Sequence, residues 1–139
     1  MSPHTAILLI NTGSPDSPKT KDVRRYLRRF LGNPRVIDMP AVSRYLLVNG
    51  IIAPFRAPKS EKLYRQLWTS NGAPLVYYAQ RIKDELQTVF ADKADVYMGM
   101  SFGQPLLGSV LKTIREKNYT RLIVLPLFPQ YASSSSGVA

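Results

Sequence analysis

The stretch Ile7–Pro15, which reads ILLINTGSP, decides the fold class of this chain. Its apolar residues run directly into a loop of small and polar residues that ends in proline, a pattern typical of a buried strand followed by a loop. A second stretch of this kind, Leu125–Gly137 (LPLFPQYASSSSG), lies near the other end of the chain. Parallel α/β sheets bind ligands in the loops at the carboxyl ends of their strands, so we expect both loops to belong to a binding site.

Helical and strand patterns alternate between these two stretches. Strands are predicted over residues 5–11, 95–101 and 121–128. Helices are predicted over residues 18–31, 40–54, 60–70 and 75–90, and a fifth is predicted to begin at Gln104-Pro105. Serine or proline marks the helix starts, and Gly32 and Pro54 mark two of the ends. This alternation predicts an α/β fold with an open parallel sheet and helices on both faces.

The composition limits the chemistry that this chain can perform. Its 139 residues suit one domain, and 45% apolar with 20% charged residues is ordinary for a soluble protein. The lack of cysteine excludes disulfides and thiolate sites and suits the cytosol. A single histidine, His4, is too few for a histidine metal cluster or a catalytic triad within the chain. Met1–His4 does not resemble a signal peptide, and Tyr45–Phe55 is shorter than the ~20 residues that span a bilayer.

The net charge of +10 indicates either simple solubility or an acidic partner. An anionic ligand and an anionic membrane surface both fit this charge. Nucleic acid fits less well, because no recognised nucleic-acid motif accompanies the basic residues. We therefore expect no nucleic-acid partner.

Two local features are candidate ligand contacts, each with a plainer interpretation. The loop Thr12–Pro15 could cradle a phosphate, but it matches neither a Walker A loop nor a dinucleotide fingerprint, so it could equally be an ordinary strand-to-helix turn. Arg56 and Lys59, close in sequence to Tyr64, could hold the carboxylates of a flat apolar ligand. Their alternative interpretation is a solvated surface with extended cationic side chains.

Several segments, taken in order, identify a family. They are Leu9–Pro15, Val23–Leu31, Pro34–Val36, Pro58–Tyr64, Gly72–Leu75, Met100–Gly103 and Leu125–Tyr131. In order and spacing, this series resembles the N-terminal half of the ferrochelatases, the lyases that insert ferrous iron into a porphyrin in haem biosynthesis. The resemblance implies a two-lobed enzyme with the porphyrin between its lobes. Residues 1–139 are then expected to be an incomplete N-terminal lobe, with the C-terminal lobe absent from this chain.

The resemblance also implies a set of substrate-binding residues that line or border the porphyrin cleft. They are Thr12, Arg28, Arg56, Lys59, Tyr64, Phe102 and Tyr131. Thr12 and Phe102 would lie by the macrocycle, Tyr131 in the cleft, and the others near the propionates. Residues 45–55, with Leu27, would form part of a hydrophobic lip in peripheral contact with a membrane, on an otherwise cytoplasmic protein. The partners implied are the porphyrin and the second lobe, and Fe²⁺ is a substrate of the intact enzyme rather than a cofactor bound by this chain.

Two departures and one gap accompany the resemblance. The family commonly has arginine where Ser101 stands and serine where Ala73 stands. The family's metal-handling histidine and glutamate lie in the second lobe, so no catalytic or metal-binding residue is assigned here. Porphyrin metallation requires a base for the pyrrole protons and a ligand that passes on the metal. We therefore expect the intact protein to be a ferrochelatase and this chain alone to be inactive.

Other functions remain open on the sequence. One is another tetrapyrrole chelatase, which would handle its metal through histidines. The other is a non-catalytic basic α/β module whose positive face binds an acidic partner. The sequence also leaves open whether the porphyrin is protoporphyrin IX, with two propionates, or coproporphyrin III, with four.

Overall fold

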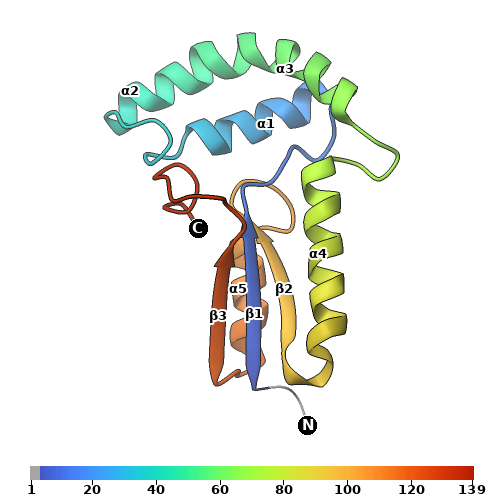
Figure 1. Cartoon of the computed structure of the whole chain (residues 1–139). Coiled ribbons are helices and arrows are strands. Elements are labelled where there is room, and N and C mark those ends of the chain that lie inside the picture. The colour runs from blue at the N-terminus through green and yellow to red at the C-terminus, as the bar shows by residue number, and fades with distance from the viewer. Residues whose placement is uncertain (1–3) are drawn as a thin grey trace.

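The computed structural model describes residues 4–139 and contains a three-stranded parallel sheet (Figure 1). Strand β1 (Thr5–Asn11) lies in the centre, between β2 (Asp95–Met100) and β3 (Arg121–Pro126). In the register of the sheet, Ile7 of β1 pairs with Val96 on one side and Ile123 on the other. The predicted open parallel sheet is therefore confirmed. Residues 1–3, which enter the signal-peptide prediction, lie outside the described residues.

Helices cover both faces of the sheet, as the sequence predicts. On one face, Leu9 and Ile7 of β1 pack against Leu86 and Phe90 of helix α4 (Pro74–Phe90). On the other face, Leu8 packs in a cluster with Ile114 of helix α5 (Leu107–Glu116). Successive side chains of a strand point to opposite faces, so the unbroken apolar run of β1 is buried on both sides. The short turn η2 (Ala91–Lys93) connects α4 to β2.

The remaining helices lie beyond the carboxyl ends of the strands (Figure 1). Helix α1 (Thr20–Leu31) packs its apolar stripe, including Val23 and Leu27, against Val48 and Ala57 of a long second helix. That helix consists of α2 (Ala41–Leu46), the π-helical turn η1 (Leu47–Ile52) and α3 (Ala53–Leu67). These two helices, α1 and the helix formed by α2, η1 and α3, place their side chains beyond the carboxyl ends of the strands. No helix within residues 4–139 is long and apolar enough to cross a membrane.

The prediction of two separate helices over residues 40–54 and 60–70 is wrong, because they form one continuous helix. Pro54 does not end it: it directly follows the wide turn η1, and a second proline, Pro58, lies inside α3 without ending the helix. Burial of Val48, Ala53 and Ala57 stabilises the helix on both sides of Pro54.

Two other helix starts differ from the prediction. Helix α1 begins at Thr20 rather than Pro18, because the Ser17 hydroxyl accepts a hydrogen bond from the Lys19 amide and donates one of 2.6 Å to Asp22. Helix α5 begins at Leu107 rather than Gln104-Pro105. The Met100 amide donates to the Pro105 carbonyl over 2.7 Å, which keeps that segment beside β2 instead of in the helix.

Candidate functional site

Three cavities, of about 330, 310 and 470 Å³, lie along α3. Residues of α1 line the second and third, and the loop after β1 lines the third. Arg56 lines the first two cavities, and Tyr26, Tyr64 and Leu67 line both the second and the third. The second and third cavities share three residues and adjoin each other, whereas the first meets the second only at Arg56 and opens on the outer side of α3. We call the three cavities together the α3 groove.

The α3 groove brings together four of the predicted site residues. Lys59 and Arg56 line its first cavity, Tyr64 lines the two deeper ones, and Thr12 lines the far end. Residues separated by more than 40 positions in the sequence thus border the same depression, because β1 delivers Thr12 to the carboxyl edge of the sheet beneath α3. Two cations lie at one end of the groove, and the far end is uncharged.

Phe102 lies behind the wall of the groove rather than in it. The side chain is buried, and its ring meets the ring of Phe30 edge to face, with 5.2 Å between the centroids. Phe30 itself lines the middle cavity. Phe102 therefore supports the groove through Phe30.

Arg28 and Tyr131 do not line the α3 groove. Arg28 is exposed and follows Tyr26 by two residues, which places it on the opposite side of α1. Tyr131 is 75% exposed in the loop after β3. Their proposed contacts with the ligand stay predictions.

The groove carries positive charge from Arg56 and Lys59 and neutral phenols elsewhere. Burial raises the pKa of Tyr26 above its ordinary value, and the neighbouring Tyr64 adds to this. Burial also raises the pKa of Tyr64, although the positive charge of Arg56 opposes the shift. Both phenols therefore stay protonated at neutral pH, where they can donate hydrogen bonds.

Sequence reasoning missed part of the lining. Tyr26 and Phe30 of α1 are buried or half-buried, and both line the middle cavity of the groove, although neither was predicted as a site residue. Their rings stack with centroids 6.0 Å apart, and Tyr26 meets Tyr64 edge to face at 6.5 Å. Aromatic residues four apart on a helix were the available signal, although this spacing alone does not separate core from groove.

Comparison with known proteins decides the family. The family model for Ferrochelatase matches residues 4–139. The chain belongs to the ferrochelatase family. A ferrochelatase of Coxiella burnetii (strain Dugway 5J108-111) is 43% identical over 133 residues, which are 96% of this chain and 38% of the relative. One of Legionella pneumophila (strain Corby) is 41% identical over 133 residues, 96% of this chain and 40% of the relative. The chain thus spans about two fifths of the length of these ferrochelatases.

One of the two departures from the ferrochelatase pattern, Ala73, lies in the groove. Ala73 lines its far end, where a serine would add a hydroxyl. Ser101, at the end of β2, has a buried hydroxyl without a hydrogen-bond partner in the described structure.

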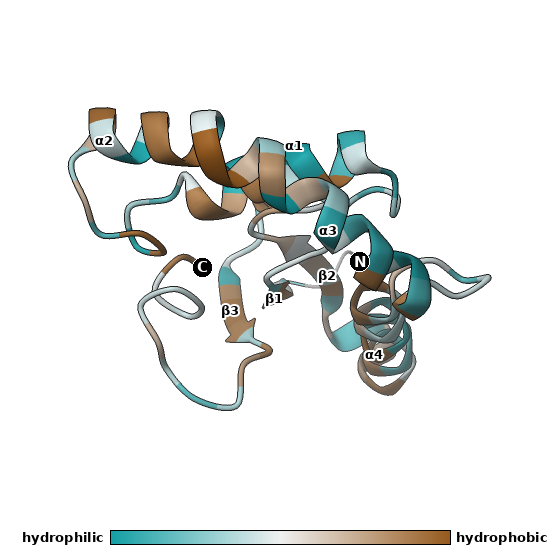
Figure 2. Cartoon of the chain, turned by 90° about the horizontal axis from the view of Figure 1, so that it is seen from above, coloured by the Kyte–Doolittle hydropathy of each residue, from teal (hydrophilic) through white to brown (hydrophobic). Residues whose placement is uncertain are grey.

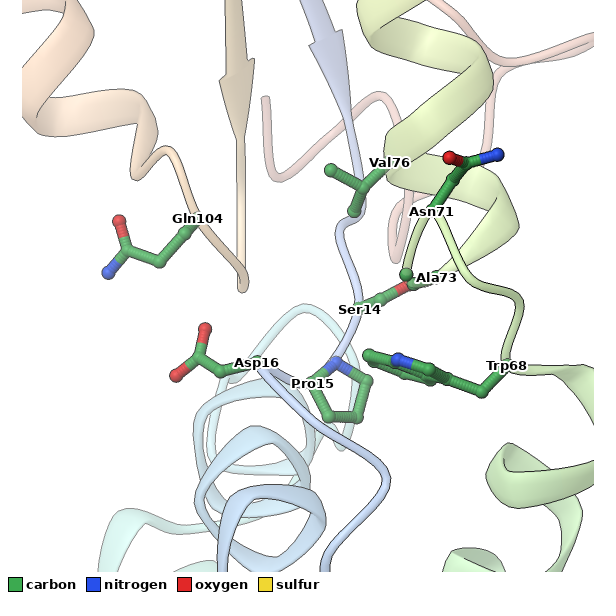
Figure 3. A pocket seen from close by; sticks show the side chains of 9 residues that line it. Ser14, Pro15, Asp16, Trp68, Asn71, Ala73, Val76 and Gln104 are labelled. Atoms are coloured by element: carbon green, nitrogen blue, oxygen red, sulfur yellow. The ribbon is translucent and has the colours of Figure 1, made fainter.

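A smaller cavity of about 230 Å³ adjoins the groove through Ser14 and Ala73 (Figure 3). The Trp68 indole lies beside Pro15 in it, and Asp16 lies at its edge. Asp16 forms an ion pair of 3.3 Å with Arg25, which offsets its charge. Within residues 4–139 no three histidine, cysteine, aspartate or glutamate side chains are grouped to hold a metal ion.

Proposed function

We propose that this chain forms one wall of the porphyrin cleft of a ferrochelatase, the lyase that inserts ferrous iron into a porphyrin. The observation that carries the proposal is the α3 groove, whose successive cavities are lined by Lys59 and Arg56, by Arg56 and Tyr64, and by Tyr64 and Thr12. Membership of the ferrochelatase family supports the same reaction.

The chemistry of the groove suits a flat, amphipathic ring. Aromatic and aliphatic side chains, among them Tyr26, Tyr64 and Leu67, offer apolar surface to a macrocycle, and each Å² removed from water contributes about 25 cal/mol. Arg56 and Lys59 at one end can bind propionates through charge-assisted hydrogen bonds. The far end, lined by Pro74 and Leu75, offers no cation. This polarity favours a porphyrin with its carboxylates on one edge.

We further propose that the groove by itself cannot complete metal insertion. Insertion releases two pyrrole protons, which a base must take up. The titratable groups that line the groove are protonated phenols and cations, which do not accept protons at neutral pH. The base and the metal ligand would then come from the part of the ferrochelatases that this chain does not match.

We also propose that the predicted hydrophobic lip, residues 45–55, contacts a membrane surface. Tyr45, Leu46, Ile51 and Phe55 are exposed at 66, 62, 58 and 71%. Figure 2 shows hydrophobic colour along α2 and the turn that follows it. These residues adjoin the cationic end of the groove through Phe55 and Ile51. An apolar porphyrin could then enter directly from a membrane surface.

A titration of the chain with a free-base dicarboxylic porphyrin, followed by Soret absorbance, tests the binding. We expect a saturable shift, and Arg56→Ala with Lys59→Ala should weaken binding about tenfold or more, since a hydrogen bond to a charged group contributes about 1.5 kcal/mol or more. The matched control is Lys112→Ala with Arg115→Ala, an exposed pair with the same spacing on α5. No saturable shift, or an equal loss in the control, would contradict the proposal. Binding that collapses with added salt would favour a basic module instead.

A further inference from the structure

Tyr26 of α1 lies where the middle and far cavities of the α3 groove meet, and it lines both. We propose that Tyr26 is a positioning residue for the bound ring: its hydroxyl fixes the loop that carries Thr12, and its ring fixes Tyr64. This inference rests on the proposed porphyrin site. Tyr26 also lines the groove directly.

The hydroxyl acts on the loop after β1. It donates a hydrogen bond of 3.3 Å to the carbonyl of Gly13. The preceding carbonyl, of Thr12, accepts from the Phe102 amide over 2.9 Å. Two consecutive loop carbonyls are thus bound by different elements, α1 on one side and the loop after β2 on the other. The orientation of Thr12 depends on both.

Little space is left for the loop to adjust. Gly13 has a φ of +99°, and a Cβ placed on it would lie 2.7 Å from the amide nitrogen of Gly103. The loop therefore rests directly on the loop after β2. Without the Tyr26 hydroxyl, a buried carbonyl would lose its donor, and the loop would have to move to find another.

The aromatic ring of Tyr26 contacts the α3 side of the groove. It meets Tyr64 of α3 edge to face at 6.5 Å and stacks on Phe30 at 6.0 Å. Phe30 in turn contacts Phe102. One side chain thus touches the Thr12 loop, the α3 wall and the aromatic support beneath them. A phenylalanine would keep the ring contacts and lose only the loop contact.

The experiment compares Tyr26→Phe with the wild-type chain in a Soret titration with a free-base dicarboxylic porphyrin. We expect about fivefold weaker binding, the loss of one net hydrogen bond, and a displaced Soret maximum at saturation. Tyr26→Leu should weaken binding further, because the contact with Tyr64 is also lost. The control is Tyr119→Phe, which removes a phenol that hydrogen-bonds Asp95 and Tyr97 near the opposite ends of the strands. It should lose stability without a change in the Soret maximum.

Wild-type affinity and an unchanged Soret maximum in Tyr26→Phe would overturn the inference. Absence of any Soret shift in the wild-type chain would instead contradict the proposed function. The loop contact is then tested without porphyrin, by the amide resonances of Thr12, Gly13 and Ser14. Tyr26→Phe should move these resonances and Tyr119→Phe should not; unmoved resonances in Tyr26→Phe would also overturn the inference.

Discussion

At the scale of single residues, a few side chains form hydrogen bonds with backbone groups that have no partner within a helix or the sheet. Gln87 of α4 is one of them. Its side chain accepts from the Val96 amide over 2.8 Å and donates to the Ala94 carbonyl over 3.0 Å. It therefore supplies the free edge of β2 with the hydrogen bonds that a neighbouring strand would make.

We expect Gln87→Ala to lower the free energy of unfolding by about 1–2 kcal/mol, because three backbone groups, the Val96 amide and the Ala91 and Ala94 carbonyls, lose a hydrogen bond. Urea denaturation followed by circular dichroism measures the change. Gln80→Ala, on the same helix but bonded to the exposed Asp84, is the control and should change stability little. Equal effects of the two substitutions would show that Gln87 does not protect the edge.

Gly13 and Gly108 should respond to alanine in opposite directions. Gly13→Ala introduces a Cβ at a φ of +99° and against the Gly103 backbone, so we expect a loss of about 2 kcal/mol or more. Gly108 lies in the first turn of α5 with no atom within 4 Å of an added Cβ. Gly108→Ala should raise stability by about 0.5–1 kcal/mol. Thermal unfolding compares them, and a neutral Gly13→Ala would contradict the close approach.

Burial of Tyr26 predicts a loss of stability in alkali. Its pKa is raised in the folded chain, so above pH 10, the ordinary value for tyrosine, the unfolded chain binds fewer protons than the folded one. The free energy of unfolding therefore falls as pH rises, by at most about 1.4 kcal/mol per pH unit for this group. Tyr26→Phe should flatten the slope measured by urea denaturation between pH 9 and 11. A slope unchanged by the substitution would contradict this assignment.

At the scale of elements, β3 differs from the other strands in its exposure. Leu122, Ile123, Val124 and Leu125 are 42, 39, 48 and 47% exposed, although their continuous apolar pattern is typical of a strand buried on both faces. The strand is also a free edge of the sheet. Exposed apolar edge strands favour association between molecules.

We expect this chain to self-associate as its concentration rises and Val124→Lys to reduce that association. Sedimentation velocity over a concentration series measures it. Val89→Lys places the same charge on a 74% exposed residue of α4, away from any strand edge, and serves as the control. Association that responds equally to both substitutions would indicate a general charge effect instead.

The elements also show how far the sequence predicts this structure. The apolar runs of β1 and β2 and the amphipathic pattern of α1 predicted those elements because burial of one stripe or one run decides them locally. The continuity of α2, η1 and α3 was missed, since it depends on packing of Val48 and Ala57 against α1. Proline signals predict a break only when no such packing opposes them.

At the scale of the whole molecule, the fold and part of the site follow from the sequence for different reasons. Alternating strands and helices predict the parallel sheet by general rules of chain connection. The grouping of Thr12 with Arg56, Lys59 and Tyr64 as substrate contacts was predicted through family resemblance and stays a prediction; Thr12 and Tyr64 line one cavity, and Arg56 and Lys59 line another. Tyr26 was not predicted as a groove residue, because its role depends on contacts between α1, α3 and the loop after β1.

The most direct test of the account is a methyl nuclear magnetic resonance titration of the chain with a free-base dicarboxylic porphyrin. The ring current of a macrocycle seated in the α3 groove should shift the methyl resonances of Thr12, Leu67 and Leu75, which line it. The methyls of Val110 and Ile114, on α5 across the sheet, should not move. Shifts confined to the groove are the predicted result; shifts centred on α5, or none at saturating porphyrin, would contradict the claim that this chain forms a porphyrin-binding wall.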